Sequence, residues 1–277
     1  MIVSFHSIFE ADTNIICAGR APNAADLAAI KTAKAVILNQ GCGRALYEAA
    51  RANCPNIFPN YDAKFKYPGK IGQIKLFRQI NICHPSTEIY ADIASFHAKY
   101  DQPPFRLPWQ YPIVFKLDWG GEGDTVYLIN STDDLQKILK QTAGFEKSGQ
   151  SGFLLQAYVP SNNKTLRVVV IGQRLISYWR ILPNSDGFQT SLSKGAIIDR
   201  TVEPQLQQKA AALIKSVCQK TGINLAGFDV IFSSENPDPP PLLLEINYFF
   251  GRKGLGGSEA YYTVLQEEIR AWLEMIG

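Results

Sequence analysis

The sequence predicts a mixed α/β (α+β) protein, with a small α/β domain first and a larger mixed domain after it. Three observations support this prediction. The first third of the chain alternates short apolar runs with helical segments, the later part contains strand pairs joined by tight turns, and the composition suits globular domains. Of the 277 residues, 46% are hydrophobic and 19% are charged, which is enough apolar material for two domains of modest size.

The first third of the chain reads as alternating strands and helices. An apolar run near the N-terminus predicts a strand, and an alanine-rich stretch with its apolar residues on one side predicts a helix. The expected elements, in order, are a strand over residues 2–9, a helix over 24–33, a strand over 35–38, a helix over 44–53 and an extended piece over 56–59. This order favours a small unit with parallel strands.

The middle of the chain combines one helix with strands that flank a glycine-rich loop. The turn signal YPG at residues 67–69 precedes apolar residues that predict a helix over 70–80. The prolines between residues 103 and 108 then predict a border between subdomains close to them. The expected elements that follow are a strand over 112–117, the loop DWGGEGD, a strand over 125–129, a helix over 134–141 capped by residues 131–133, and a strand over 153–159.

The C-terminal part predicts a hairpin, two long helices and two apolar strands. The tripeptide GQR at residues 172–174, between two apolar runs, is a strong hairpin signal, and Pro204 suits the first turn of a helix. A proline-rich loop, SENPDPPP, separates the last two strands. The expected elements are strands over 166–171 and 175–182, a helix over 203–220, strands over 228–233 and 242–246, and a helix over 259–275.

Composition and charge exclude several classes of protein. The net charge is only +3 and the lysines and arginines are scattered, which is too weak a signal for a nucleic-acid-binding protein. The five cysteines are widely spaced and form no C-x-x-C pair, so a disulfide framework or a zinc site is not expected. No stretch approaches the ~20 apolar residues of a membrane span, and no basic leader begins the sequence. We therefore expect a cytoplasmic protein without nucleic-acid or membrane partners, and homo-oligomer formation stays open.

Three oxygen-bearing side chains lie in the last two apolar strands. Asp229 lies in LAGFDVIF, and Glu245 and Asn247 lie in LLLEINYF. Because side chains alternate along a strand, Glu245 and Asn247 share one face, Leu244 and Ile246 point the other way, and a paired neighbouring strand can bring Asp229 alongside. Burying two carboxylates without a cation is costly, and Mg²⁺ prefers carboxylate and amide oxygens. We expect a magnesium site here, with ordinary strand-end polar residues as the alternative.

A lysine and a glycine-rich loop indicate a phosphate site. Lys116 lies inside the apolar strand PIVFKL, where a lysine needs a partner, and a phosphate is a good one. The loop after it contains Gly120, Gly121 and Gly123, whose backbone N–H groups can approach phosphate oxygens closely. A plain hairpin is the alternative for this loop. Lys70, at the start of its helix, is a second candidate phosphate contact, with a solvated surface lysine as the alternative.

The strand FLLQAYVP offers a candidate contact for an adenine ring. A strand that runs directly into an irregular segment can present a backbone N–H and C=O to the edge of a base. The candidates are Gln156, Tyr158 and Val159. An ordinary strand end is the alternative.

Four basic residues are candidates for binding a phosphoryl group or a substrate carboxylate. Guanidinium groups suit both ligands, because their paired N–H donors match two oxygens. The four are Arg167, Arg180, Lys194 and Arg252. Surface solubility is the competing interpretation for each. The three histidines and the cysteines are interpreted as structural.

The order of these features resembles the ATP-grasp superfamily. The shared features are a strand lysine, a glycine loop, a Q-x-Y-V strand end, the hairpin L-R-V-V-V-I-G and a closing D…E-I-N. The likeness is closest to the branch that adds glutamate to ribosomal protein tails, with relatives that make glutathione-like or cyanophycin-like peptides. It runs from about residue 67 to the C-terminus, and the stretch GKIGQIKLFRQ looks like the central-domain lysine segment of the family.

The resemblance implies an ATP-grasp fold, in which two α+β subdomains hold ATP between them behind a small pre-ATP-grasp domain. The implied boundaries are 1–66 for the pre-ATP-grasp domain, 67–158 for the central subdomain with the phosphate loop, and 159–277 for the C-terminal metal-binding subdomain. It also implies that the two lysines, 70 and 116, and the loop glycines contact the phosphates, and that residues 156, 158 and 159 hold adenine. Arg180 and Lys194 would face the γ-phosphate or an acyl phosphate as catalytic residues.

The function that the resemblance implies is that of an ATP-dependent carboxylate–amine ligase. Such an enzyme uses ATP with Mg²⁺, or Mn²⁺ in its place, to activate a small-molecule or peptide carboxylate as an acyl phosphate. An amine then displaces phosphate, which leaves an amide or peptide bond and ADP. The alternatives are a kinase-like phosphotransferase of the same superfamily and a catalytically inactive nucleotide-binding regulatory module.

Several positions depart from the pattern of the family. Ala157 stands where close relatives have glutamate, Thr165 stands near the position of an acidic ribose contact, and Ser191 replaces a frequent asparagine. The loop YFFGRKGLGG replaces the usual loop of small residues. Its aromatic residues, with one from the loop PNSDGFQTSLSKG, hint at a partly apolar acceptor, although core packing explains them equally well; they are Tyr248, Phe249, Phe250 and Phe188.

Overall fold

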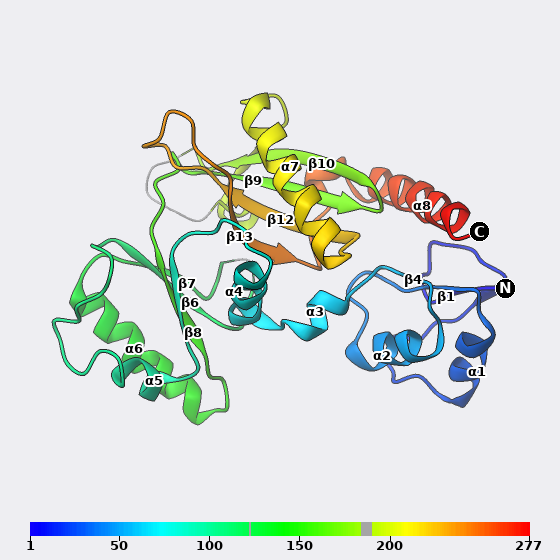
Figure 1. Cartoon of the computed structure of the whole chain (residues 1–277), viewed down its shortest axis with the longest axis horizontal. Helices are drawn as coiled ribbons and strands as arrows, with labels where there is room; N and C mark the ends of the chain where they lie inside the picture. Colours follow the sequence, from blue (N-terminus) through cyan, green and yellow to red (C-terminus); the bar gives the residue numbers. More distant parts are fainter. Residues whose placement is uncertain (122, 184–189) are drawn as a thin grey trace.

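Three β-sheets organise the chain, and helices pack on each of them (Figure 1). This computed structural model describes residues 1–121, 123–183 and 190–277, so Phe188 lies outside the described residues. The sheets have the strand orders β2-β1-β3-β4, β5-β8-β6-β7 and β11-β10-β9-β12-β13. The predicted α+β class is confirmed, with a small unit at the N-terminus and two mixed units after it.

The first sheet is parallel, as predicted. Its strands are β1 (Ile2–Ser4), β2 (Thr13–Asn14), β3 (Ala35–Ile37) and β4 (Ile57–Phe58), and its helices are α1 (Ala24–Thr32) and α2 (Arg44–Asn53). The strand expected over residues 2–9 ends early. Ser4 Oγ accepts a hydrogen bond from the His6 N–H and donates one to the His6 carbonyl, both 3.1 Å long, which turns the chain away from the sheet.

The second sheet is antiparallel and forms one wall of the site described below. Its strands are β5 (Thr87–Tyr90), β6 (Ile113–Leu117), β7 (Val126–Ile129) and β8 (Phe153–Ala157). The helices α5 (Ile93–His97) and α6 (Thr132–Lys147) pack on it, and α4 (Gly69–Gln79) lies between it and the third sheet. The short helix α3 (Asp62–Lys66) precedes α4 and packs through Phe65 against the N-terminal unit. The subdomain border expected at the prolines is wrong. Because β5 pairs with β8, the chain before and after these prolines builds the same sheet.

The third sheet is also antiparallel and carries the hairpin predicted at residues 172–174. Its strands are β9 (Lys164–Ile171), β10 (Arg174–Ile181), β11 (Ile197–Asp199), β12 (Leu225–Ile231) and β13 (Leu242–Asn247). The remaining helices are α7 (Pro204–Thr221), α8 (Ser258–Met275) and the 3₁₀ turns η1 (Leu192–Lys194) and η2 (Lys253–Leu255). Both long helices begin within one residue of the prediction.

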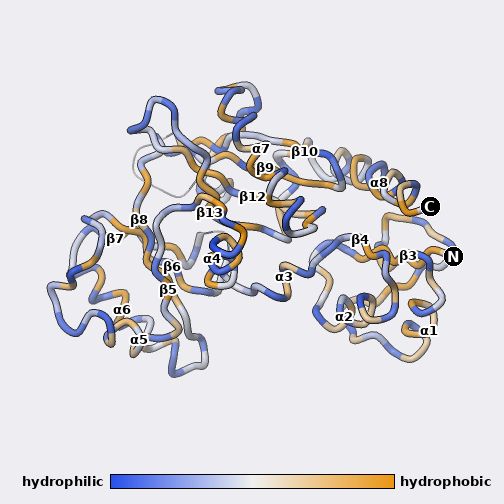
Figure 2. The backbone as a smooth tube through the Cα atoms, viewed as in Figure 1, coloured by the Kyte–Doolittle hydropathy of each residue, from blue (hydrophilic) through white to orange (hydrophobic). Residues whose placement is uncertain are grey.

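Buried apolar side chains join the three sheets. Figure 2 shows hydrophobic segments along the strands and hydrophilic ones in the loops between them. One core packs α4 and α7 against the third sheet, through residues such as Phe77, Ile214 and Phe228. Another packs α8 between the third sheet and the N-terminal unit, where Ile37 and Tyr261 belong to one cluster. The domain boundaries after residues 66 and 158 stay predictions. Across the described ranges, no helix is both long and apolar enough to cross a membrane.

Candidate active site

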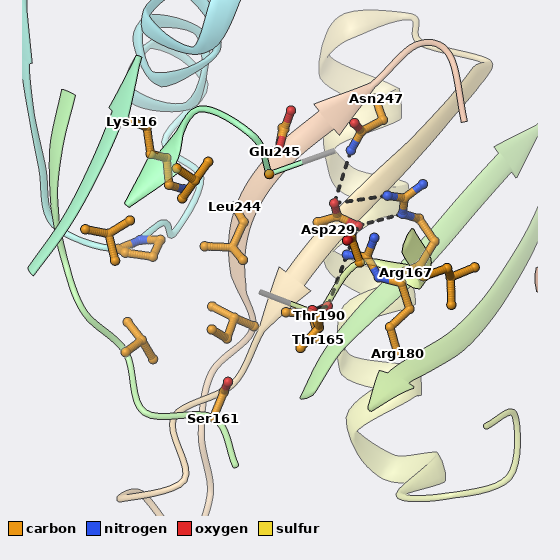
Figure 3. A pocket seen from close by; sticks show the side chains of 18 of the residues that line it. Lys116, Ser161, Thr165, Arg167, Arg180, Thr190, Asp229, Leu244, Glu245 and Asn247 are labelled. Atoms are coloured by element: carbon orange, nitrogen blue, oxygen red, sulfur yellow. Dashed lines mark hydrogen bonds and ion pairs between the residues drawn. The ribbon is translucent and has the colours of Figure 1, made fainter. Parts of the chain in front are cut away.

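A cavity of about 300 Å³ lies between the second and third sheets (Figure 3). The strands β6, β7 and β8 supply one wall, and β9, β10, β12 and β13 supply the other. Ten of the candidate binding residues predicted from the sequence line this cavity: Lys116, Gly123, Gln156, Tyr158, Val159, Arg167, Arg180, Asp229, Glu245 and Asn247. Five others are not among its lining residues, namely Lys70, Gly120, Gly121, Lys194 and Arg252.

The pairing of β12 with β13 brings the three oxygen-bearing side chains together. Asp229 lies opposite Glu245 in the antiparallel register of these two consecutive strands, so the pairing brings residues 16 positions apart to the same part of the sheet. The register shifts between Asp229 and Val230, which pairs with Leu243 and leaves Leu244 as the extra residue. Strict alternation directs Leu244 away from the site, and this expectation is wrong. The bulge turns Leu244 into the cavity wall.

Asp229 is held by two arginines and an amide. Arg167 donates from Nε to Oδ1 at 2.6 Å and from Nη2 to Oδ2 at 3.1 Å. Arg180 Nη2 lies 2.8 Å from Oδ1, and Asn247 Nδ2 donates to Oδ2 at 3.2 Å. Burial opposes ionisation, but the two guanidinium groups lower the pKa of Asp229 to about 2. Four contacts use the full acceptor capacity of an ionised carboxylate.

Glu245 has a different environment from Asp229. It forms no ion pair within the parts of the chain that the structure describes. Burial raises its pKa and the charge of Asp229 adds to that effect, while Lys116 and Lys70 oppose it. A carboxylate that is costly to ionise and lacks a cationic partner in contact is suited to binding a cation.

The residues at this point fit a divalent cation only in part. The Glu245 carboxylate and the Asn247 amide oxygen suit Mg²⁺. Asp229 fits when one of its four donors gives up an oxygen. In residues 1–121, 123–183 and 190–277 there is no group of three or more His, Cys, Asp or Glu that could hold a metal ion. A cation here would therefore depend on Asn247, water and the oxygens of a bound ligand.

Lys116 projects from β6 on the opposite wall (Figure 3). Burial lowers its pKa to about 8, Lys70 adds to this effect, and Glu245 and Asp229 oppose it. The cavity thus has cations on both walls, with Lys116 on one side and Arg167 and Arg180 on the other. Such an arrangement suits a ligand with several negative charges, because positive groups face the cavity from both walls.

Lys70 is hydrogen-bonded to the glycine loop and to Thr125 at its end. Its Nζ donates to the Trp119 carbonyl at 3.0 Å, to the Gly120 carbonyl at 3.2 Å and to Thr125 Oγ1 at 3.4 Å. The side chain is buried, so the alternative of a solvated surface lysine is wrong. Gly120 has a φ of +83°, and a Cβ added there would lie 2.5 Å from Thr125 Cγ2, so the turn requires glycine.

Residues of β8 and of the chain directly after it line one part of the cavity. The Gln156 side chain is buried and donates from Nε2 to Thr87 Oγ1 at 2.8 Å, and its strand pairs with Thr87 on one side and Val114 on the other. Tyr158 and Val159, beyond the end of β8, therefore have the backbone groups that remain as adenine candidates. Both walls also contribute apolar lining residues, namely Pro85 and Val114 on the side of β8, and Ile231 and Leu244 on the side of the third sheet. The three positions that depart from the family, Ala157, Thr165 and Ser191, also line the cavity.

Two basic residues lie beside the cavity rather than in its wall. Lys194 lies in η1 and is 3.9 Å from Asp124, across the cavity on the loop before β7. Arg252 lies over the rings of Tyr261 and Tyr262, 4.9 and 4.3 Å from their centroids. The catalytic role of Lys194 stays a prediction.

The aromatic residues after Asn247 have separate roles. Phe250 is buried and packs edge-on against Tyr261, and Tyr248 packs edge-on against Tyr61, so core packing explains both. Phe249 is 73% exposed and lines the cavity. Phe250 and Leu192 also line the cavity, so three apolar side chains of these two loops are available for contact with an acceptor.

Among the residues that hold Asp229, Arg167 is the one for which the sequence predicts the least specific role. It lies in β9 among leucine and valine residues and is nearly buried. The signal that identified Lys116, a charged residue inside an apolar strand, applies equally to Arg167. Arg180 also donates to Thr165 Oγ1 at 3.0 Å, so the hydroxyl predicted to stand near the position of an acidic ribose contact is itself bonded to this arginine.

Comparison with known proteins gives the family and the fold. A family model described as the RimK-like ATP-grasp domain matches residues 69–268. An uncharacterized protein of Mycoplasma pneumoniae is 27% identical over 129 residues, which are 46% of this chain and 41% of that protein. A probable alpha-L-glutamate ligase of Legionella pneumophila is 26% identical over 145 residues, 52% of this chain and 44% of that ligase. The match thus spans less than half the length of these curated relatives.

Solved structures share the fold at low sequence identity. A RimK domain ATP-grasp protein from Sphaerobacter thermophilus has a TM-score of 0.59 at 14% identity, covering 98% of this chain and 100% of that one. The ADP complex of an N5-carboxyaminoimidazole ribonucleotide synthetase has a TM-score of 0.63 at 13% identity, covering 94% and 66% of the two chains.

Proposed function

The chain belongs to the RimK-like ATP-grasp family, and we propose that it is an ATP-dependent ligase that joins a carboxylate to an amine. The family match and the relatives named probable alpha-L-glutamate ligase support the ligase part of this proposal. The finer proposal is that Mg-ATP binds in the cavity and that the product is an amide or a peptide bond. The observation that carries it is the placement of Lys116, Arg180 and the unpaired Glu245 around one cavity between two sheets.

Each lining group has a part in the proposed reaction. Lys116 and Arg180 would bind the phosphate oxygens of ATP, while the backbone after β8 receives the adenine ring. Glu245, Asn247 and Asp229 would hold Mg²⁺, which offsets the negative charge on the phosphates when it is bound. Substrate carboxylate oxygen attacks the γ-phosphorus, the bond to ADP breaks, and an acyl phosphate forms. Amine nitrogen then attacks the acyl carbon, phosphate leaves, and the nitrogen loses a proton.

The glycine loop would protect the acyl phosphate from water. Such an intermediate hydrolyses easily, so the loop must cover it while the amine approaches. Gly123 lines the cavity, and Lys70 fixes the base of the loop by donating to the Trp119 and Gly120 carbonyls. In this proposal Lys70 orders the loop, and a direct phosphate contact would require it to exchange these carbonyls for phosphate oxygens.

The experiment that tests the function is an ADP-release assay with Mg-ATP across amino acids and short peptides. We expect ADP to form only when both a carboxylate and an amine are supplied, with one amide bond made per ADP. ADP release with a phosphorylated product and no amine requirement would identify a kinase instead. Tight Mg-ATP binding without turnover under all these conditions would identify a nucleotide-binding module.

Replacing Lys116 by alanine should weaken the binding of a non-hydrolysable ATP analogue with Mg²⁺ by about 10-fold to 100-fold. The size follows from the loss of one charge-assisted hydrogen bond, which contributes about 1.5–3 kcal/mol. Isothermal titration calorimetry measures it. The matched control is Lys137→Ala, because the Lys137 side chain is 79% exposed on α6. Unchanged affinity in Lys116→Ala would assign Lys116 a structural role.

The pKa of Lys116 also predicts how this affinity depends on pH. Because burial lowers that pKa to about 8, the ammonium group loses its proton in mildly alkaline solution. Wild-type affinity for the analogue should therefore fall as pH rises from about 7 to about 9, a range in which an ordinary lysine stays charged. Lys116→Ala should lose this dependence. An equal fall in both proteins would show that another group is responsible.

A further inference from the structure

The side-chain amide of Gln73 in α4 bonds to the backbone of Ile246 in β13. Gln73 Nε2 donates to the Ile246 carbonyl at 2.9 Å, and the Ile246 N–H donates to Gln73 Oε1 at 2.8 Å. Within the third sheet β13 is an edge strand that pairs with β12 alone. The Gln73 amide therefore supplies the Ile246 backbone with the donor and the acceptor that a neighbouring strand would otherwise supply.

Ile246 stands between two residues of the candidate metal site. In an antiparallel strand the backbone groups of successive residues face opposite edges. Since Gln73 takes both backbone groups of Ile246, those of Glu245 and Asn247 face β12, where the register places them opposite Asp229 and Gly227. All three residues of the E-I-N segment thus have their backbone held, two by β12 and one by Gln73.

Gln73 is itself held firmly in place. Its helix carries Ile74 and Phe77, which are buried in the same apolar cluster as the Ile246 side chain. Helix and strand are therefore packed together, and the amide bonds add direction to that packing. Packing alone would allow β13 to slide or rotate slightly, whereas a two-point amide contact fixes its orientation.

We propose that Gln73 is a positioning residue that sets how Glu245 and Asn247 present their oxygens to a divalent cation. The proposal rests on the proposed function, because it gives these oxygens a cation to bind. Without Gln73 the Ile246 backbone loses both partners on the open edge, and the strand that carries two of the three ligands can twist. Gln73 is not among the residues that line the cavity, so its role would be indirect.

The test compares Gln73→Met with wild type in two measurements. Methionine keeps the length of the side chain and removes both hydrogen bonds. In the nucleotide-free protein, NMR-detected hydrogen exchange at the Ile246 amide should become about 10-fold faster or more, in line with loss of its hydrogen bond. The Leu243 amide, which donates to the Cys83 carbonyl at 2.9 Å on β13, is the internal reference and should keep its rate.

The second measurement is the Mg²⁺ concentration that gives half-maximal ADP release at saturating ATP. It should rise about 10-fold or more in Gln73→Met, the range seen when groups that orient metal ligands are removed, and turnover should recover at high Mg²⁺. Gln208→Met, at an exposed position of α7, is the matched control and should keep the wild-type midpoint. A role limited to stability would lower the melting temperature and leave the Mg²⁺ midpoint unchanged.

The outcomes separate the inference from the proposed function. Wild type that releases no ADP with any substrate pair contradicts the proposed function. The Ile246 exchange rate then tests separately whether Gln73 holds the backbone of Ile246, and an unchanged rate in Gln73→Met overturns the inference. Active wild type with an unshifted Mg²⁺ midpoint in Gln73→Met overturns the inference. Should Gln73→Met not fold, Gln73→Glu keeps the acceptor for the Ile246 N–H and loses the donor. It should shift the midpoint in the same direction, and an unshifted midpoint again overturns the inference.

Discussion

Glutamine in place of Glu245 should lower Mg²⁺-dependent ADP release by at least about 100-fold, because loss of a metal ligand should exceed the effect of losing a group that only orients one. The substitution keeps the shape of the side chain and removes its charge. Steady-state ADP release over a range of Mg²⁺ concentrations measures the effect. Glu235→Gln, at an exposed loop position, is the matched control and should stay active. A fully active Glu245→Gln protein would contradict the assignment of Glu245 as a metal ligand.

The same substitution should leave the nucleotide-free protein at least as stable as wild type. Burial raises the pKa of Glu245 above its ordinary value of 4.5, so ionisation of this group costs folding free energy near neutral pH. The contribution of Glu245 to the unfolding free energy of the wild type therefore falls as pH rises from 4.5 through the folded pKa. Glutamine, which does not ionise, removes that penalty. The difference in unfolding free energy between variant and wild type should be present at pH 7 and should shrink as the solution is acidified toward 4.5.

Asparagine in place of Asp229 should have the opposite effect on stability. It leaves Arg167 and Arg180 without a carboxylate, and their side chains are only 9% and 12% exposed. Removing one partner of a buried ion pair costs about 3–5 kcal/mol, because the remaining charge has neither water nor a counter-ion. Urea unfolding at neutral pH measures the loss. Asp238→Asn, at a pair whose carboxylate is 89% exposed, should change stability little.

The pH dependence of Asp229 gives a second check on this network. The two guanidinium groups hold its pKa at about 2, below the ordinary value of 3.8. A carboxylate with a lowered pKa contributes stability above its unfolded pKa and loses it as pH falls through the folded pKa. The stability gap between wild type and Asp229→Asn should therefore be complete at neutral pH and narrow below 3.8. A gap that stays constant into acid would mean that the ion pairs contribute nothing.

Sequence reasoning found the parts of the site that depend on local pattern. A charged residue inside an apolar strand is conspicuous, which is why Lys116 and Asp229 were predicted and why Arg167 was recognisable by the same rule. Alternation correctly placed Glu245 and Asn247 on one face. The parallel N-terminal unit also followed from its order of strands and helices.

The features that were missed depend on contacts between distant residues. The turn of Leu244 into the cavity comes from a register shift against β12, which no property of the β13 sequence reveals. Gln73 and Ile246 are 173 positions apart, and glutamine in a helix is common, so their contact has no local signal. The false border at the prolines has the same origin, because pairing of β5 with β8 is decided by the whole sheet.

Helix α4 connects the two walls of the cavity. Lys70 binds carbonyl groups of the loop after β6, and Gln73 binds β13, so the two attachment points are three residues, or about 4.5 Å, apart along the same helix. Because a short helix is rigid, α4 keeps the distance between the loop and the edge strand nearly constant. The walls cannot swing apart freely along this line. A motion that separates the loop from β13 along α4 must therefore break one of these two attachments.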